Sequence, residues 1–324
     1  MQTRRPTGCA PWPIVLLAGA EKAGKSWAAA EATGHEMIRD AYWLGIGEDD
    51  PDEYAQVPGA DFQIVEHDGT YAALLASLRD IVALEADPDR PDLLIVDSMG
   101  RLWAQLSDMA QAEANERAAA KARKYHRSEP EDDVQITMDL WNRAKGRWGE
   151  VLDLLRAFRG PVIVTARLSV VTVMDAQGQP TKEKTDKVEA EKNLPYEVAA
   201  VVKMRARGEV ELSGVRSVKL QLERPTRLNE FSVAKLWESM GVGEGMGERH
   251  HAGHPATPPA AEVDPAVQWL DAVMAEETVD GLRALWRDAQ KAGAMNDGLA
   301  AAINQRAADL APEAAAEAPA ESAA

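Results

Sequence analysis

The sequence predicts an α/β protein in which helices flank a mainly parallel sheet, followed by a small C-terminal helical module. Three observations lead to this fold class. Short apolar segments alternate with segments of helical spacing over the first 240 residues, a pattern typical of βαβ units. The first apolar segment runs into a glycine-containing loop and then a helix of small residues. After residue 262 only helical spacing remains.

Each predicted element follows from its periodicity. Four short apolar runs predict buried strands, at Ile14–Ala18, Ala41–Ile46, Leu93–Val96 and Val162–Thr165. An acidic turn, 47–52, follows the second strand. Apolar residues at helical spacing predict helices at Tyr71–Leu84 and Met138–Phe158. Composition predicts two more, Trp27–Ala32 with its small residues and Ser107–Lys124 with its alanine and charge, and we expect Phe231–Met240 to close the domain.

The region after the fourth strand is more polar. Leu168–Asn193 carries a turn signal at Gln177–Pro180 and predicts a long mobile loop. Val198–Arg205 and Val215–Leu222 predict two further strands, joined by a charged hairpin around Gly208–Gly214.

Composition excludes several classes of protein. With 36 Lys and Arg against 53 Asp and Glu, the net charge is −17, so a nucleic-acid site must be a local basic patch. The single cysteine, Cys9, excludes an intramolecular disulfide framework and a cysteine-rich zinc site. No apolar run approaches 18 residues and the start is polar and basic, which predicts a soluble cytoplasmic protein without a membrane span.

Changes in composition divide the chain into four parts. Residues 1–240 form the α/β domain, 241–262 a linker, 263–310 the helical module and 311–324 a disordered Ala/Glu tail. The linker holds His250, His251 and His254. A histidine cluster can bind metal, but nothing downstream completes a site, which favours the linker interpretation.

The loop after the first strand carries the chemistry. Residues 19–26 match G-x-x-x-x-G-K-[ST], and the loop follows a strand and precedes a helix, as a phosphate-binding loop requires. Its glycines turn the backbone so that N–H groups face phosphate oxygens, Lys25 serves the β- and γ-phosphates, and the Ser26 hydroxyl serves Mg²⁺. The helix that begins here adds its dipole. We therefore predict that ATP and Mg²⁺ bind at Gly19, Ala20, Glu21, Lys22, Ala23, Gly24, Lys25, Ser26 and Trp27.

Three charged residues follow the other strands. Asp97 ends Leu93–Val96, where a P-loop protein holds the Mg²⁺ shell; the alternative is an ordinary strand-ending aspartate. Ser98 beside it fits two roles, polarising the site or capping the next helix.

Glu48 follows the second strand, where a carboxylate can orient and deprotonate the attacking water. Asp49, Asp50 and Asp52 stand close by, and spacing alone does not choose among them. Arg167 follows the fourth strand and is either a sensor of the γ-phosphate or a solvated loop arginine.

These segments resemble RecA-like recombinase ATPases. Residues 42–54, YWLGIGEDDPDEY, are similar to the family's strand and turn bearing the catalytic glutamate, and Leu94-Ile95-Val96-Asp97-Ser98 resembles its Walker B strand. Residues 162–167, VIVTAR, resemble the strand leading into the DNA-binding loop called L2. The family ends that strand in a glutamine that couples ATP to DNA, whereas this chain has Arg167.

A narrower resemblance is to phage-encoded Sak-type single-strand annealing ATPases, carried by residues 141–145, 165–167 and 191–198. Together the resemblances cover roughly Pro13–Met240. They imply a RecA-like ATPase domain, single-stranded DNA as ligand and assembly into rings or filaments. They also imply work with a single-strand binding protein or other replication and recombination proteins in the host cytoplasm.

Two segments are candidates for DNA contacts. A basic run with Tyr125 inside it offers phosphate contacts and a stacking ring; the alternative is a solvated helix face. The position of the L2-like segment favours a second set. The candidates are Arg117, Lys121, Arg123, Lys124 and Arg127 in the run, and Lys182, Lys184 and Lys187 in the segment. Arg224 lies where the resemblance places a residue that reaches a neighbour's ATP, and a plain surface arginine fits it equally.

Three functions are compatible with the sequence. The favoured one is an ATPase that acts on single-stranded DNA in phage recombination or replication. A RecA-fold helicase motor predicts strand separation, but no helicase motif can be placed. A non-catalytic DNA-binding scaffold would use ATP only as an assembly switch. A small-molecule kinase fits the Asp97-Ser98 ending less well.

Overall fold

The structure is a computed structural model that describes residues 3, 5–48, 51–87, 90–175, 177–243, 246, 269, 272–273, 276, 278–292, 295 and 297–310. The chain divides into two compact units, Met1–Ala256 and Thr257–Ala324, and each is described by itself.

The described part of unit 1 is built on one nine-stranded sheet in the order β3-β2-β4-β5-β1-β7-β8-β9, with β6 paired to β5. The six strands from β3 to β7 in this order run parallel, while β6, β8 and β9 are antiparallel to their partners. Their bounds are β1 Ile14–Gly19, β2 Ala41–Gly45, β3 Gln63–Ile64, β4 Leu93–Asp97, β5 Val162–Met174, β6 Pro180–Glu189, β7 Ala200–Ala206, β8 Glu209–Val215 and β9 Thr226–Leu228. The predicted α/β class with a mainly parallel sheet is confirmed.

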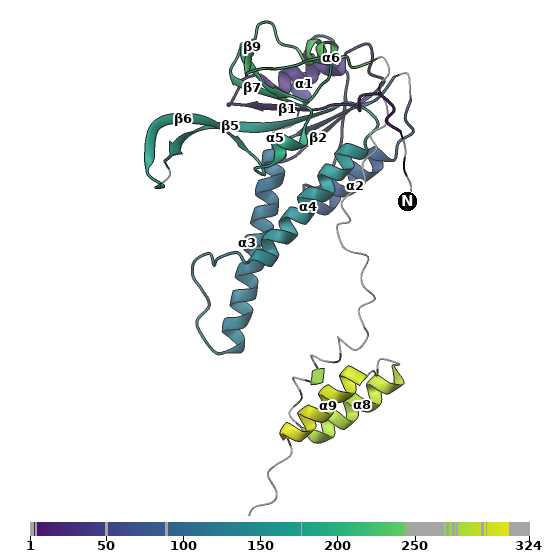
Figure 1. The fold of residues 1–324 in the computed structure, drawn as a ribbon, viewed down its shortest axis with the longest axis vertical. Coiled ribbons are helices and arrows are strands. Elements are labelled where there is room, and N and C mark those ends of the chain that lie inside the picture. The colour runs from purple at the N-terminus through teal and green to yellow at the C-terminus, as the bar shows by residue number, and fades with distance from the viewer. Residues whose placement is uncertain are drawn as a thin grey trace, which may run out of the picture. The chain divides into compact units, whose positions relative to one another are not determined.

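Helices cover both faces of the sheet (Figure 1). One face packs on α1 (Lys25–Thr33) and α6 (Val233–Met240). The other packs on α2 (Tyr71–Val82), α3 (Met99–Lys124), α4 (Met138–Ala157) and α5 (Leu194–Glu197). A short 3₁₀ helix, η1, spans Pro51–Gln56. Burial on both faces explains why the central strands are continuous apolar runs.

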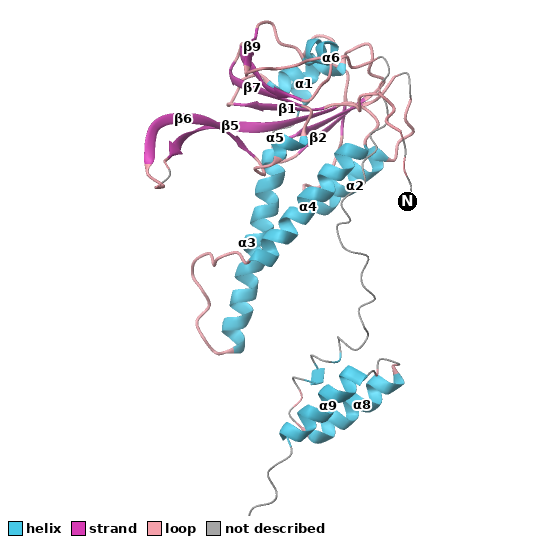
Figure 2. Cartoon of the chain, in the orientation of Figure 1, coloured by secondary structure: helices cyan, strands magenta, loops and turns pink. Residues whose placement is uncertain are grey.

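The segment Leu168–Asn193 is not the predicted loop. β5 continues from the core to Met174 and pairs with β6 in an antiparallel hairpin that projects from the sheet (Figure 2). Its strands are largely exposed, so cross-strand pairs support it rather than a buried face. The run Val170–Val173 is rich in β-branched residues, which favour strands. The segment it pairs with is charged, so the sequence alone did not predict a second strand.

The strands after the hairpin also differ from prediction. β8 occupies Glu209–Val215, the segment predicted as the charged connection, and Val215–Leu222 forms no strand beyond Val215. Val210 and Leu212 are buried on β8, whereas Glu209 is exposed and Glu211 is half-buried and pairs with Arg205. That period-2 alternation is typical of a strand, but the glutamates in the segment favoured the prediction of a charged connection.

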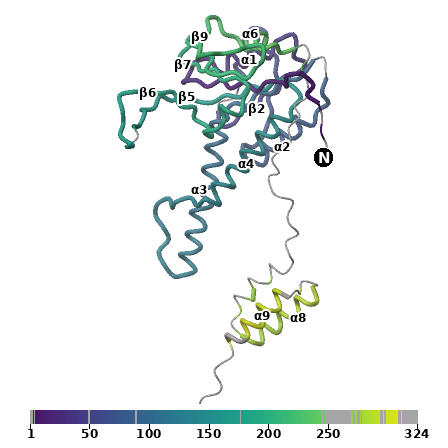
Figure 3. The backbone as a smooth tube through the Cα atoms, in the orientation of Figure 1, coloured from purple at the N-terminus to yellow at the C-terminus, as the bar shows by residue number. Residues whose placement is uncertain are grey.

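Helix α3 begins at Met99, eight residues before the predicted start, because the Ser98 hydroxyl accepts from the Arg101 N–H and caps it. With α4 it forms a helical pair that leaves the sheet, and the chain between them lies at its far end (Figure 3). At 1.5 Å per residue, the 26 residues of α3 span about 39 Å.

Unit 2 contains α8 (Val279–Lys291) and α9 (Asp297–Leu310) around a small core that includes Leu282, Leu299 and Ile303. The predicted tail and the three linker histidines lie outside the described residues, and the predicted domain limits stay predictions. Among the described residues, no helix has the length and apolar character needed to cross a membrane.

Candidate nucleotide-binding site

Strand register gathers the predicted site residues at one edge of the sheet. Gly19, at the end of β1, lies opposite Arg167 on β5 and Met204 on β7. On the neighbouring pair, Gly45 lies opposite Asp97. Since these strands are parallel, their carboxyl ends share an edge, which is where ligands bind in such sheets.

The loop between β1 and α1 has the shape of a phosphate cradle. Gly24, the N-cap of α1, adopts a left-handed conformation with φ of 98°, which glycine accepts without steric cost. The Lys25 ammonium donates to the carbonyls of Gly19 and Ala20 at 3.1 and 2.9 Å, which holds it across the loop. Burial lowers the pKa of Lys25, and the charges of Asp97 and Glu48 oppose that shift.

Asp97 lies beneath the loop and is 7% exposed. Its carboxylate accepts from the Ser26 hydroxyl at 2.9 Å and from the hydroxyl of buried Thr165. Burial raises the pKa of Asp97, and these two hydrogen bonds oppose the rise. Sequence reasoning singled out Ser26 and Asp97 but not Thr165, although a hydroxyl inside the apolar run Val162–Ala166 was a usable signal, since a buried hydroxyl needs a partner.

Glu48 lies at the mouth of the site with four contacts to three residues. Its carboxylate accepts from Arg167 Nη2 at 3.3 and 3.1 Å and from the Ser98 hydroxyl at 2.9 Å. Arg101 Nε lies 3.7 Å away. Ser98 therefore both caps α3 and holds Glu48, and the two residues that were separate candidates, Glu48 and Arg167, form one ion pair. The contact of Arg101 with Glu48 could not be predicted from the sequence. It depends on where α3 begins, because that start determines the side of the helix on which Arg101 lies.

The donor set fits Mg²⁺ and a triphosphate. Mg²⁺ prefers oxygen ligands and keeps several waters, so one or two protein groups plus phosphate oxygens suffice. Ser26 and Asp97 supply such oxygens at 2.9 Å from each other. The Asp97 carboxylate is buried and the hydroxyls that donate to it are neutral, so a cation bound beside it would balance its charge. Among the described residues, no cluster of three or more His, Cys, Asp or Glu could hold a metal without such phosphate oxygens.

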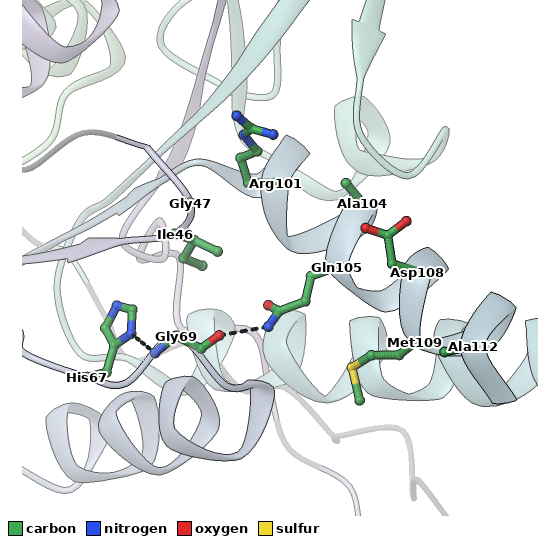
Figure 4. A pocket seen from close by; sticks show the side chains of 10 residues that line it. All are labelled: Ile46, Gly47, His67, Gly69, Arg101, Ala104, Gln105, Asp108, Met109 and Ala112. Atoms are coloured by element: carbon green, nitrogen blue, oxygen red, sulfur yellow. Dashed lines mark hydrogen bonds between the residues drawn. The ribbon is translucent and has the colours of Figure 1, made fainter.

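A pocket of about 490 Å³ lies between the turn after β2, the loop before α2 and the first half of α3 (Figure 4). Gly47 and Arg101 line it, and both also adjoin Glu48. Gln105 of α3 crosses the pocket and donates to the Gly69 carbonyl at 2.7 Å. This contact ties α3 to the loop before α2.

The basic run lies at the far end of α3, away from the sheet (Figure 3). Arg117 pairs with Glu113 and Asp139, and Arg123 pairs with Glu129. Lys121, Lys124 and Arg127 are exposed, and within the described ranges no acidic side chain lies at ion-pair distance from them. Tyr125 is 56% exposed, with the Lys124 ammonium 5.9 Å from its ring centroid. We name Lys121, Lys124, Tyr125 and Arg127 the α3 tip.

The three L2-like lysines lie on β6. Because side chains alternate along a strand, Lys184 and Lys187, both in the regularly paired part of β6, lie on opposite faces of the hairpin, and Lys182 lies beyond the register shift. Arg224 lies in the exposed connection between β8 and β9. These four residues lie apart from the phosphate loop in sequence, and their roles stay predictions.

The fold and the site define a P-loop α/β domain. The chain belongs to the AAA domain family, whose model matches residues 13–229. No curated protein matches the chain. Among solved structures, the crystal structure of the RadB recombinase is similar, at 15% identity over 69% of this chain and 90% of that chain, with a TM-score of 0.39.

Proposed function

We propose that this protein binds and hydrolyses MgATP at the phosphate loop. One observation carries the proposal: the Ser26–Asp97 pair and the Glu48–Arg167 pair meet at the edge of the sheet where the loop lies. A metal site beneath the loop and a carboxylate at its mouth are the two parts that phosphoryl transfer to water needs.

Each residue has a defined task. The loop amides and Lys25 hold the phosphates, while Ser26 and Asp97 hold the metal, directly or through its waters. Bound Mg²⁺ supplies positive charge that offsets the charge developing on the transferred phosphoryl group. Glu48 orients the attacking water and accepts its proton. Arg167, beside Glu48, positions that carboxylate and faces the γ-phosphate side.

We propose single-stranded DNA as the second ligand, in phage recombination or replication of the Sak annealing type. The sequence resemblance and the α3 tip support this, since the tip combines unpaired cations with an exposed ring, as single-strand platforms do. We further propose a ring or filament of this chain in the host cytoplasm, with Arg224 reaching the ATP of a neighbouring copy. A single-strand binding protein or other replication and recombination proteins would be its partners.

The test is ATP hydrolysis by the full chain, with and without single-stranded DNA, for wild type and Lys25→Ala. Lys235→Ala is the control, because Lys235 is an exposed lysine of α6, outside the phosphate loop, whose ammonium pairs with Glu230. We expect hydrolysis that single strands stimulate, that Lys25→Ala abolishes and that Lys235→Ala keeps.

Hydrolysis that is indifferent to DNA would leave the ATPase standing and overturn the DNA-linked role. Annealing that continues unchanged in Glu48→Gln, with ATP still bound, would instead favour the scaffold function. ATP-driven separation of a duplex would favour the helicase function.

A further inference from the structure

A large aromatic side chain stands exposed beside the phosphate loop. Trp27 is the third residue of α1, directly after Ser26, and is 44% exposed. Tryptophan is highly buried on average, and its neighbours in α1, Ala28–Ala30, are buried. The buried face of α1 is therefore formed by its alanines, and the Trp27 side chain lies outside that face.

The face of the Trp27 ring is covered by one cation. The Arg207 guanidinium carbon lies 5.5 Å from the ring centroid, a cation–π distance. Arg207 sits in the two-residue turn between β7 and β8. β7 runs parallel to β1, and its Met204 carbonyl accepts from the Ala20 N–H at 3.0 Å. The turn is thus anchored to the phosphate loop.

Strand order sets the direction in which a nucleotide must lie. Glu48 follows β2, Asp97 ends β4 and Arg167 lies within β5, and these three strands are all on one side of β1. They mark the γ-phosphate end. β7 lies on the other side of β1. Since the loop holds the α- and β-phosphates and Lys25 the β- and γ-phosphates, the nucleoside leaves the loop toward β7, where Trp27 and Arg207 lie.

We propose that Trp27 and Arg207 form the nucleobase subsite, with the base stacked on this pair. The inference rests on the proposed binding of ATP at the loop. Indole and guanidinium planes both stack on bases, and stacking reads a π-face rather than the edge groups of the base. The subsite therefore strengthens binding of nucleotides over inorganic phosphates and contributes equally for adenine and guanine.

The experiment measures binding of MgATP, MgGTP and magnesium tripolyphosphate to the full chain by calorimetry. The variants are Trp27→Ala, Trp27→Phe and Arg207→Ala. Arg227→Ala is the control, an exposed arginine of β9 opposite Glu211. Tripolyphosphate carries the phosphates without a base, so it separates loss of stacking from damage to the loop.

We expect Trp27→Ala and Arg207→Ala to weaken ATP and GTP by the same factor, about tenfold or more, with tripolyphosphate binding unchanged. Trp27→Phe should keep most of the affinity, and Arg227→Ala all of it. Unchanged ATP affinity in Trp27→Ala, or equal weakening of ATP and tripolyphosphate, would overturn the subsite. If the wild type binds tripolyphosphate as tightly as ATP, the nucleobase subsite is overturned, while the proposal that the loop binds phosphates is kept. Wild type that binds neither would overturn both proposals.

Discussion

Arg167 and Glu48 are 119 residues apart in sequence, yet Arg167 Nη2 lies 3.1 Å from Glu48 Oε2. Both side chains are partly exposed, so the pair by itself contributes little to stability. Its importance lies in position, because it holds the Glu48 carboxylate, which follows β2, at the edge of the sheet where the phosphate loop lies.

Replacing Arg167 with alanine should therefore lower ATP turnover without affecting folding. We expect kcat to fall about 100-fold, typical for loss of one preorganised charged donor, with ATP affinity nearly unchanged. Arg167→Lys should recover part of the rate. Steady-state kinetics with matched thermal melts would check this. A faster Arg167→Ala enzyme would mean that the arginine restrains Glu48 instead.

Glu48→Gln should keep ATP binding and lose hydrolysis. A general base contributes about 10²- to 10⁴-fold, so turnover should drop by that factor. Asp52→Asn is the control from the same acidic turn, and it should hydrolyse ATP like wild type. If Asp52→Asn lost activity and Glu48→Gln kept it, the catalytic carboxylate would have been assigned to the wrong residue.

Asp97→Asn should stabilise the fold and impair the enzyme. Burial raises the pKa of Asp97, so the folded state favours the protonated acid. The stability advantage of protonation is present below the unfolded pKa, near 3.8, and is lost as pH rises through the folded pKa. At neutral pH the neutral amide should therefore raise stability by about 0.5–2 kcal/mol, with little gain at acid pH.

The same variant should lose about 10- to 100-fold in activity or Mg²⁺ affinity. Denaturation at neutral and acid pH, together with magnesium titration of the ATPase, would check both halves. A variant that is less stable at neutral pH would contradict the argument.

Gly100→Ala should destabilise unit 1 and disturb the base of the β5–β6 hairpin. A Cβ at Gly100 would lie 2.4 Å from the backbone carbonyl oxygen of Glu189 on β6, and neither backbone can yield cheaply. We expect a loss of about 1–3 kcal/mol, as for overpacking in cores. Gly146→Ala on α4 meets nothing within 4 Å and should gain about 0.5–1 kcal/mol. Urea denaturation of both variants would measure these changes. Equal losses of unfolding free energy in the two variants would refute the close contact at Gly100.

The α3 tip should dominate affinity for single-stranded DNA. Each phosphate contact contributes about 0.7 to the slope of log affinity against log salt, so removing three cations should reduce the slope by about 2. The comparison is Lys121, Lys124 and Arg127 all to alanine against Lys182, Lys184 and Lys187 all to alanine. Both lose three charges. A larger effect from the β6 triple variant would place the DNA on the hairpin.

Much of the core could be predicted because its strands are buried on both sides. Such strands are unbroken apolar runs, and the residues that end them, Asp97 and Arg167, mark the ligand edge. The phosphate loop could be predicted without a structure, because the spacing of its glycines, lysine and serine is what phosphate binding requires. Contacts that pass between strands, such as Thr165 with Asp97, depend on register, which short apolar runs do not fix.

The hairpin and β8 differ from the sequence prediction for a different reason. Both are strands with charged faces, and charged segments are typical of loops. In β8 the signal was present, because Val210 and Leu212 alternate with glutamates. In β6 it was absent, since no face of Lys182–Lys187 is apolar and only pairing with β5 defines the strand.

β5 is a single strand of 13 residues whose first half is walled in by β1 and β4 and whose second half stands free with β6. Arg167 marks the boundary. Two paired strands resist bending within the plane of the sheet. A partner that binds the outer end of β5 near Met174 would therefore transmit its displacement along the strand to Arg167. Since Arg167 pairs with Glu48, we expect such a partner to shift the Glu48 carboxylate without contacting the phosphate loop.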